Sequence, residues 1–283
     1  MIKKVITMSM AVLLIACNNE TSNTNNAGET KSDTAKKEVA SEPTNDFADF
    51  KFHTLVVNIP SPFEIITLLP KSNIAFNKGL INSTDNESKY VTSTKKGLNY
   101  GSYIVDLVYL SSNEQFSQVK TYFKTTRNLA QSLGCADSFD KIAGSRLEKN
   151  IDKKDTINMV IDQIYTEMDG YLRTNDRLLS ASQILVGSWV ESQYITVSLI
   201  KGETKNKDNE ILFQKVSEQG NTIDKLIELL KEFEKEKDFL PVINELKELS
   251  KIYKDVKIGN DIDKSTLSKI SDKLGSIRSK IVN

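Results

Sequence analysis

Histidine and cysteine are scarce in this chain of 283 residues, which limits the chemistry open to it. The chain contains one histidine, His53, and two cysteines, Cys17 and Cys135. Structural zinc sites use clusters of Cys and His, and ferritin-like dimetal sites use Glu-x-x-His pairs, so neither kind of site is expected. A Ser-His-Asp triad would have to use His53, and no nucleophile motif or glycine-rich phosphate loop is present. The sequence therefore predicts a protein that is not an enzyme and holds no metal or other cofactor.

A surplus of charge and a long apolar run are also missing. Lys plus Arg and Asp plus Glu each number 38, so the formal net charge is zero. Without a basic surplus, binding to nucleic acid or to acidic lipid headgroups is not expected. The most apolar stretch covers residues 5–16, whereas a helix that spans a bilayer needs roughly 20 such residues. We therefore expect neither a nucleic-acid partner nor a transmembrane helix.

That short apolar stretch has the layout of a secretory signal. Lys3 and Lys4 precede it, and it ends in Leu-Ile-Ala-Cys at residues 14–17. These four residues resemble the bacterial lipobox, in which small or apolar residues precede the cysteine that becomes the first residue of the mature protein. An ordinary signal peptide with an unrelated cysteine is the alternative. The coincidence of charge, apolar core, small residue and cysteine favours the lipobox.

The lipobox resemblance gives the two cysteines different expected roles. It implies that cleavage follows Ala16, that the Cys17 sulfur carries a diacylglycerol, and that the new amine is acylated, for example with palmitate. Several acyl chains anchor a protein firmly, because each buried CH₂ contributes about 0.8 kcal/mol. A thioether sulfur cannot form a disulfide, so Cys135 is left alone. We expect Cys135 to be a small buried hydrophobic residue, with a reactive thiol or an intermolecular partner as alternatives.

A polar segment follows the cysteine over residues 18–46. It has one Val and no Leu, Ile or aromatic residue, so it cannot bury enough apolar surface to offset the entropy of ordering. We expect residues 17–46 to form a lipidated cysteine and a disordered tether with a reach of roughly 30 Å. Asn18 stands where some bacteria place an Asp that retains lipoproteins in the inner membrane. This favours an outer-membrane location facing the periplasm.

The rest of the chain has few Gly and Pro residues and the apolar periodicity of helices. We expect an all-α bundle of about eight or nine helices, with a core domain over residues 47–201 and a charged helical segment over residues 207–283 packing on or beside it. Helices are predicted over 62–69, 85–111, 116–133, 138–150, 157–172, 176–201, 223–233, 243–253 and 267–281. The only strand candidate is residues 52–59.

Three stretches carry a resemblance to known proteins. Residues 59–82, 89–110 and 187–199 resemble a set of all-helical lipoproteins from the phylum Bacteroidota. The similarity spans most of residues 59–200 and weakens in the charged C-terminal part. It implies a lineage and an all-helical fold, and it supplies no catalytic residues, because the set has no established activity.

Two carboxylates stand out, because each lies in a helix that otherwise looks buried. Asp106 lies in YIVDLVYL and Glu191 in SWVESQYITV. By helical spacing, Asp106 shares a face with Asn99 and Tyr103, and Glu191 shares one with Tyr194. We therefore take Asn99, Tyr103, Asp106, Glu191 and Tyr194 as one candidate polar face.

Two interpretations of this polar face remain open. A buried carboxylate is costly unless it is paired, so in the first interpretation each has a structural partner, such as a tyrosine hydroxyl or one of the arginines Arg127, Arg146 and Arg173. In the other interpretation, both faces meet in a polar cleft that holds a ligand or a partner segment.

Small residues at Gly97, Gly101, Gly187 and Ser188 would let the two helices approach closely in either case.

These patterns predict a membrane-anchored bacterial lipoprotein with a non-catalytic helical domain. A binding or envelope-organising role is expected, with another envelope protein as the partner. The alternative is a helical receptor for a small molecule or peptide in a cleft near Asp106 and Glu191.

Overall fold

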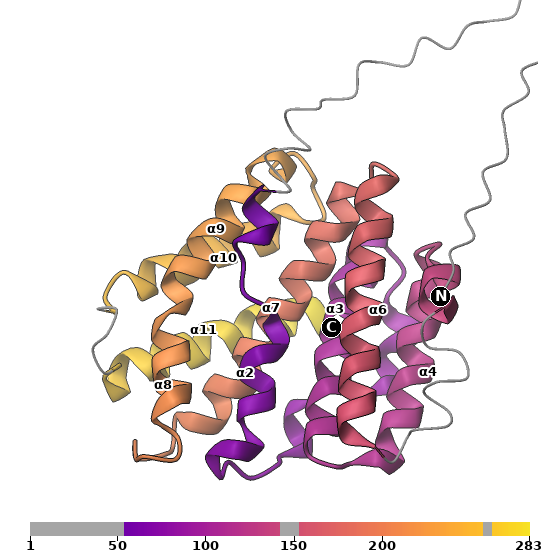
Figure 1. Ribbon diagram of the computed structural model, residues 1–283. Helices are drawn as coiled ribbons and strands as arrows, with labels where there is room; N and C mark the ends of the chain where they lie inside the picture. Colours follow the sequence, from indigo (N-terminus) through magenta and orange to yellow (C-terminus); the bar gives the residue numbers. More distant parts are fainter. Residues whose placement is uncertain (1–53, 142–152, 257–261) are drawn as a thin grey trace, which may run out of the picture. The chain divides into compact units, whose positions relative to one another are not determined.

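The computed structural model describes residues 54–141, 153–256 and 262–283, all within one compact unit, Asn45–Asn283 (Figure 1). All regular structure in these ranges is helical, as predicted. The predicted signal peptide, lipobox and tether all lie outside the described residues. So does most of the helix predicted over residues 138–150. Its first residues, 138–141, are described and belong to a helical run that begins at residue 136.

The described helices follow the predicted order, with one addition, α8, which was not predicted. Their bounds are α2 (Pro62–Leu68), α3 (Ser93–Ser112), α4 (Phe116–Ser132), α6 (Lys154–Thr174), α7 (Leu178–Ile200), α8 (Glu210–Ser217), α9 (Gln219–Leu230), α10 (Leu240–Tyr253) and α11 (Lys264–Val282). Four 3₁₀ helices connect them: η1 (Pro70–Ser72), η2 (Lys78–Leu80), η3 (Thr84–Lys89) and η4 (Lys231–Phe233).

The strand candidate at residues 52–59 is wrong for the part that is described. Residues 54–57 are helical, and the Asn58 side chain donates to the Thr54 carbonyl over 2.7 Å. An isolated strand leaves its backbone groups without partners, whereas a helical turn pairs them locally. No strand occurs elsewhere in the described ranges that could have paired with it.

Local capping explains where several helices begin and end. Ser61 caps α2 by accepting from the backbone N–H of Phe63. The predicted helix over residues 85–111 is split, because η3 ends at Lys89 and α3 starts afresh after its Thr92 cap. At the end of α4, Gly134 adopts a φ of 70°, a left-handed conformation that glycine adopts at little cost.

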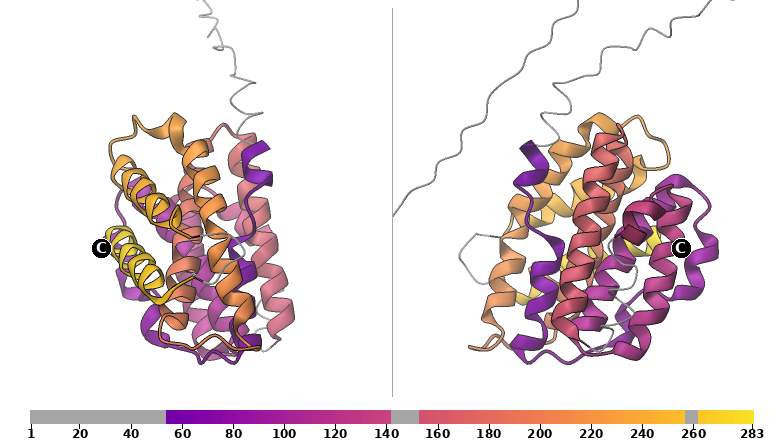
Figure 2. Two further views of the ribbon diagram at one scale, coloured as in Figure 1. Left: turned by 90° about the vertical axis from the view of Figure 1, so that its left-hand side faces the viewer. Right: turned by 45° about the vertical axis from the view of Figure 1, so that its right-hand side comes forward.

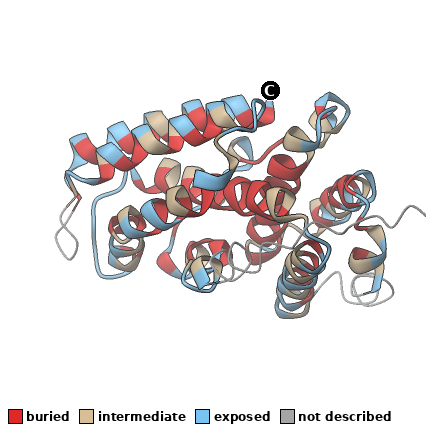
Figure 3. Cartoon of the chain, turned by 90° about the horizontal axis from the view of Figure 1, so that it is seen from above, coloured by how far each residue is buried: buried red, intermediate tan, exposed pale blue. Residues whose placement is uncertain are grey.

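Helices α3 and α7 form the centre of the unit, with the most extensive contact between any two elements. The packing is unusually close. A Cβ atom at Gly187 would lie 1.9 Å from the Leu98 carbonyl oxygen, and one at Gly101 would lie 2.2 Å from that of Ile184. The expected close approach of these helices is therefore confirmed. Figure 3 shows the buried residues gathered in the middle, with outer helices that turn exposed faces outward.

The charged C-terminal segment belongs to the same compact unit. Helices α10 and α11 lie side by side in the left view of Figure 2, and α11 also contacts α7 and α3. Its apolar stripe is buried throughout, as predicted: Leu267, Ile270, Leu274, Ile277 and Ile281. The last helix therefore completes the core around α3 and α7.

Candidate functional site

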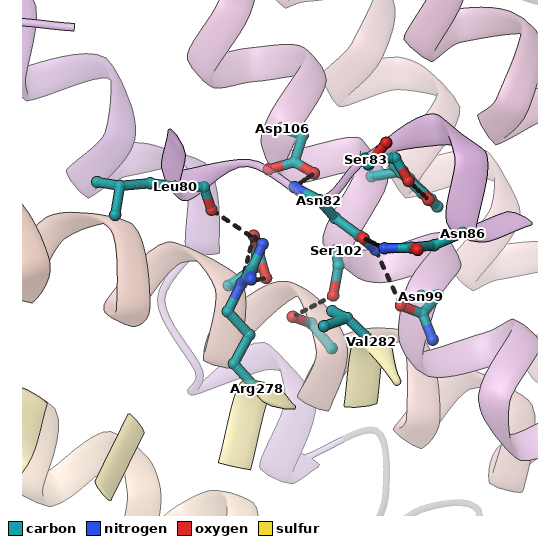
Figure 4. A network of polar contacts seen from close by, with 12 residues as sticks. Leu80, Asn82, Ser83, Asn86, Asn99, Ser102, Asp106, Arg278 and Val282 are labelled. Carbon is teal, nitrogen blue, oxygen red and sulfur yellow. Dashed lines mark hydrogen bonds and ion pairs between the residues drawn. The ribbon is translucent and has the colours of Figure 1, made fainter. Parts of the chain in front are cut away.

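The two carboxylates that the sequence singled out lie together in the centre of the unit. Asp106 on α3 and Glu191 on α7 are both fully buried. A third charged residue, Arg278, reaches them from α11 (Figure 4). Together with Asn82, Asn99 and Tyr103 these residues form what we call the buried polar cluster.

Arg278 and Glu191 form a closely matched ion pair. The Arg278 Nε lies 3.0 and 2.9 Å from the two Glu191 carboxylate oxygens, and its Nη2 lies 2.8 Å from one of them. Nη2 also donates to the Leu80 carbonyl over 2.9 Å. The guanidinium carbon lies 4.5 Å from the centre of the Tyr194 ring, a distance that allows a cation–π contact. Burial opposes the charge, but Glu191 outweighs it and raises the pKa of Arg278.

Two of the three arginines proposed from the sequence as partners pair with other carboxylates. Arg127 pairs with Asp140, and Arg173 pairs with Asp169 over 2.6 Å. Arg146 lies outside the described residues. The true partner is 87 positions away from Glu191 along the chain, so local spacing could not reveal it.

Asp106 is held differently from Glu191. Its Oδ2 accepts from the backbone N–H of Asn82 over 3.1 Å, while its buried Oδ1 receives no hydrogen bond from the described residues. Burial, followed by the nearby Glu191 carboxylate, raises the pKa of Asp106 well above its ordinary value. We infer that Asp106 is a neutral acid. A neutral Asp106 leaves one negative and one positive charge in the cluster, those of Glu191 and Arg278.

Amide side chains extend the cluster toward the end of α11. Asn82 Nδ2 donates to the Tyr90 hydroxyl over 2.9 Å and to Asn99 Oδ1 over 3.1 Å, and Asn82 Oδ1 accepts from Asn86 over 2.8 Å. Asn99 Nδ2 in turn donates to the Ile281 carbonyl over 2.8 Å. The loop before α3 is thereby connected to the last turn of the protein.

The last carbonyl groups of α11 have further donors. Lys95 Nζ donates to the Lys280 and Ile281 carbonyls, and the Tyr90 hydroxyl donates to the Val282 carbonyl over 3.4 Å. The final carbonyls of a helix have no partners within it, and a cation there interacts favourably with the helix dipole. The start of α3 therefore caps the C-terminal end of α11.

The predicted polar face is thus brought together, but as part of the core. Asn99, Tyr103, Asp106 and Glu191 are buried, and Tyr194 is partly buried at the edge, against Arg278. The Tyr103 hydroxyl donates to the Ser83 carbonyl over 2.7 Å. Neither Asp106 nor Glu191 lines the cavity between α2, α7, α8 and α9 that is described below. The geometry favours the structural interpretation and gives no support to a ligand cleft here.

Two members of the buried polar cluster, Asn82 and Arg278, were not predicted from the sequence. Asn82 lies in a loop between 3₁₀ helices, where periodicity gives no signal. Arg278 did carry one: it lies four residues after Leu274 and three before Ile281, on the edge of the apolar stripe of the last helix. It is also the only arginine after Arg177, in a segment whose other cations are lysines. A lone arginine beside an apolar stripe suits a buried, bidentate ion pair.

Cys135 is the buried hydrophobic residue that was expected, with an exposed fraction of 1%. Its sulfur lies 3.3 Å from the Leu133 carbonyl oxygen and 3.6 Å from Arg177 Nη1. Burial raises the pKa of the Cys135 thiol, and Arg177 only partly offsets this. A thiol with a raised pKa is a poor nucleophile at neutral pH.

Within the described ranges, no group of three or more His, Cys, Asp or Glu side chains is arranged to hold a metal ion. None of the described helices has both the length and the apolar character of a transmembrane span. No protein-family model, curated protein or solved structure matches the chain.

Proposed function

We propose that the chain is a lipid-anchored protein of a bacterial envelope, related to the all-helical Bacteroidota lipoproteins that it resembles. The observation that carries the proposal is the sequence before residue 18: two lysines, the apolar residues 5–16, and Leu-Ile-Ala directly before Cys17. In the proposed mature form Cys17 is the first residue and carries the acyl chains, on the periplasmic side of the outer membrane.

The compact unit begins at Asn45, well after Cys17. Lipid attachment at Cys17 would therefore leave the packing of that unit unchanged. The distance along the chain supports an arrangement in which a folded domain is carried on a tether rather than held against the bilayer.

For the helical domain we propose a non-catalytic role in binding or organising another envelope component. The buried polar cluster supports this role indirectly, because its charges hold α3, α7 and α11 together and are unavailable to a substrate. A receptor that uses Asp106 and Glu191 directly is no longer proposed. A binding role must then use a different surface or cavity.

The test of the anchor is to express Cys17→Ser in a bacterium that processes lipoproteins. Wild-type protein is expected in the outer-membrane fraction and should incorporate a labelled palmitate analogue. Cys17→Ser should lose both properties while its helical domain melts as in the wild type. The matched control is Cys135→Ala, which removes the only other cysteine and should keep both the label and the membrane location. Equal fractionation of wild type and Cys17→Ser would contradict the proposal.

A further inference from the structure

A cavity of about 280 Å³ lies between α2, α7, α8 and α9, on a part of the unit away from the buried polar cluster. In Figure 1, α2 passes in front of α7 and beside α8, and both contacts are present in the structure. The volume is close to the lower limit of about 300 Å³ for ligand pockets in proteins. It therefore suits one small organic molecule.

One side chain in the wall of this cavity has a buried oxygen without a hydrogen-bond donor. Gln193 on α7 is 2% exposed, and its Oε1 is buried with no hydrogen-bond donor among the described residues. A buried acceptor without a donor is destabilising, and such groups in proteins call for an explanation. A ligand with an N–H or O–H group would supply the missing donor.

The neighbouring polar groups are already fixed. Trp189 Nε1 donates to Gln219 Oε1 over 2.9 Å, and Gln219 Nε2 donates to the Lys215 carbonyl over 3.0 Å. These bonds hold the Trp189 and Gln219 side chains in the wall of the cavity. Thr222, which is 5% exposed, adds a hydroxyl that can both donate and accept.

The charges around the cavity cancel. Lys215 lies 2.8 Å from Glu64 and 3.7 Å from Glu218. The fourth charged group of the lining, Lys225, donates to the Asn58 carbonyl over 2.9 Å. Two lysines and two glutamates give the lining no net charge, so a charged ligand would gain nothing to offset its loss of hydration.

Pro60, Pro62, Ile65 and the Trp189 ring add apolar surface to the wall, and Ser61 and Asn221 add two further polar side chains. A fitting ligand therefore needs an apolar face as well as hydrogen-bonding groups. A neutral monosaccharide or cyclic polyol has both, with hydroxyl groups around its edge and C–H bonds on its face. Its hydroxyls can donate to Gln193 and exchange hydrogen bonds with Thr222.

We propose that this cavity, which we call the Gln193 cavity, binds a small neutral polyhydroxylated molecule of monosaccharide size. The proposal rests on the binding role suggested above and gives that role a ligand class. It does not depend on the lipid anchor. Failure of Cys17 lipidation would leave ligand binding intact, and failure of ligand binding would leave the anchor intact, so the two outcomes are distinguishable.

The experiment uses the full chain purified in detergent and a panel of glucose, galactose, mannose and myo-inositol. Glucuronate and glucosamine serve as charged counterparts, and binding is followed by ligand-observed NMR and calorimetry up to 10 mM. At least one neutral compound is expected to bind saturably with one site per chain, and the charged counterparts at least about tenfold more weakly. No saturable binding by any neutral compound, or equal binding by the charged ones, would overturn the proposal.

Gln193→Met removes the unpaired oxygen while keeping the length of the side chain. It should weaken binding by about tenfold, the effect of roughly one lost hydrogen bond, and it should not lower the melting temperature. The matched control is Gln183→Met, also on α7, where the amide is paired with Thr94 over 3.0 Å. That change should lower the melting temperature and leave binding unchanged.

Thr222→Val provides a second variant of nearly the same shape and should also weaken binding. If Gln193→Met lowers stability as much as Gln183→Met and binds the panel like the wild type, the cavity holds water alone, and the proposal fails. Wild-type affinity in Thr222→Val together with Gln193→Met would equally exclude this cavity as the binding site.

Discussion

Replacement of Arg278 by Met tests whether the buried polar cluster holds the core together. The side chain of Arg278 is 12% exposed, and that of its partner Glu191 is 0% exposed. Methionine keeps the apolar stem that crosses the interface between α11 and α7 but removes the guanidinium. The three hydrogen bonds to Glu191 and the one to the Leu80 carbonyl are lost together.

The expected loss of stability can be approached in two ways. Breaking a buried ion pair by removing one partner costs about 3–5 kcal/mol. Alternatively, the stranded carboxylate takes up a proton. For a glutamate with the ordinary pKa of about 4.3, holding that proton at pH 7 costs about 3.7 kcal/mol, because each pH unit corresponds to about 1.36 kcal/mol. The second value lies within the range of the first, so Arg278→Met is expected to lose about 3–5 kcal/mol at pH 7.

The second route also predicts how the loss depends on pH. The folded variant retains a proton that the unfolded chain has released, so the stability of the variant falls as the pH rises above the ordinary carboxyl range. At pH 5 the same proton costs only about 1 kcal/mol. The difference between wild type and Arg278→Met should therefore shrink by about 2 kcal/mol or more between pH 7 and pH 5.

Urea melts at the two pH values measure both quantities, provided that the m-values are unchanged. Arg127→Met is the matched control, because Arg127 also pairs with a carboxylate, Asp140, but both side chains are exposed. This control should melt like the wild type at both pH values. A loss below about 1 kcal/mol for Arg278→Met at pH 7 would refute the reasoning, because it would mean that water reaches Glu191 once the arginine is gone.

Two further predictions concern the packing of α3 against α7. Asp106→Asn imitates the protonated acid, so at pH 7 it should be at least as stable as wild type. Because the raised pKa of Asp106 makes wild-type stability fall as the pH rises above the ordinary carboxyl range, the melts of Asp106→Asn should depend less on pH, and a large loss at pH 7 would contradict a neutral Asp106. Gly187→Ala places a methyl group against the Leu98 carbonyl and should cost about 3 kcal/mol or more. Its control is Gly170→Ala on α6, where a Cβ meets no atom within 4 Å and should add about 0.5–1 kcal/mol of stability, as thermal melts can check.

Regular features of the fold were predictable because they depend on local spacing. The three- and four-residue spacing from Leu267 to Ile281 identified both the last helix and its buried face. The pairs of small residues near Gly101 and Gly187 predicted the close approach of two helices that are far apart in the sequence. In both cases the residues on one face of a helix are enough to predict how that face packs.

The connections between elements were harder to predict. The break before α3 depends on Thr92, whose side chain caps the new helix, whereas the apolar pattern alone suggested that one helix continued through it. The candidate strand at residues 52–59 was misread because alternating and helical patterns are difficult to separate in so short a run. In both cases a local side-chain hydrogen bond, from Lys95 to Thr92 and from Asn58 to Thr54, accompanies the structure that the apolar pattern did not indicate.

The candidate site was predictable in part for the same reason. Asp106 and Glu191 stood out because each is a charge in an apolar helix, and both proved to be buried. Their surroundings come from Asn82 in a loop and Arg278 near the end of the chain. These partners are fixed by packing over long separations, which a single sequence does not record.

The central claim is the lipid anchor, and the mass of the mature N-terminus tests it most directly. Protein expressed in a lipoprotein-processing bacterium is extracted from membranes, digested and analysed by tandem mass spectrometry. The account predicts an N-terminal peptide that begins at Cys17 and carries a diacylglyceryl thioether. An unmodified Cys17, a peptide that still contains Ala16 before it, or a disulfide from Cys17 to Cys135 would contradict the account.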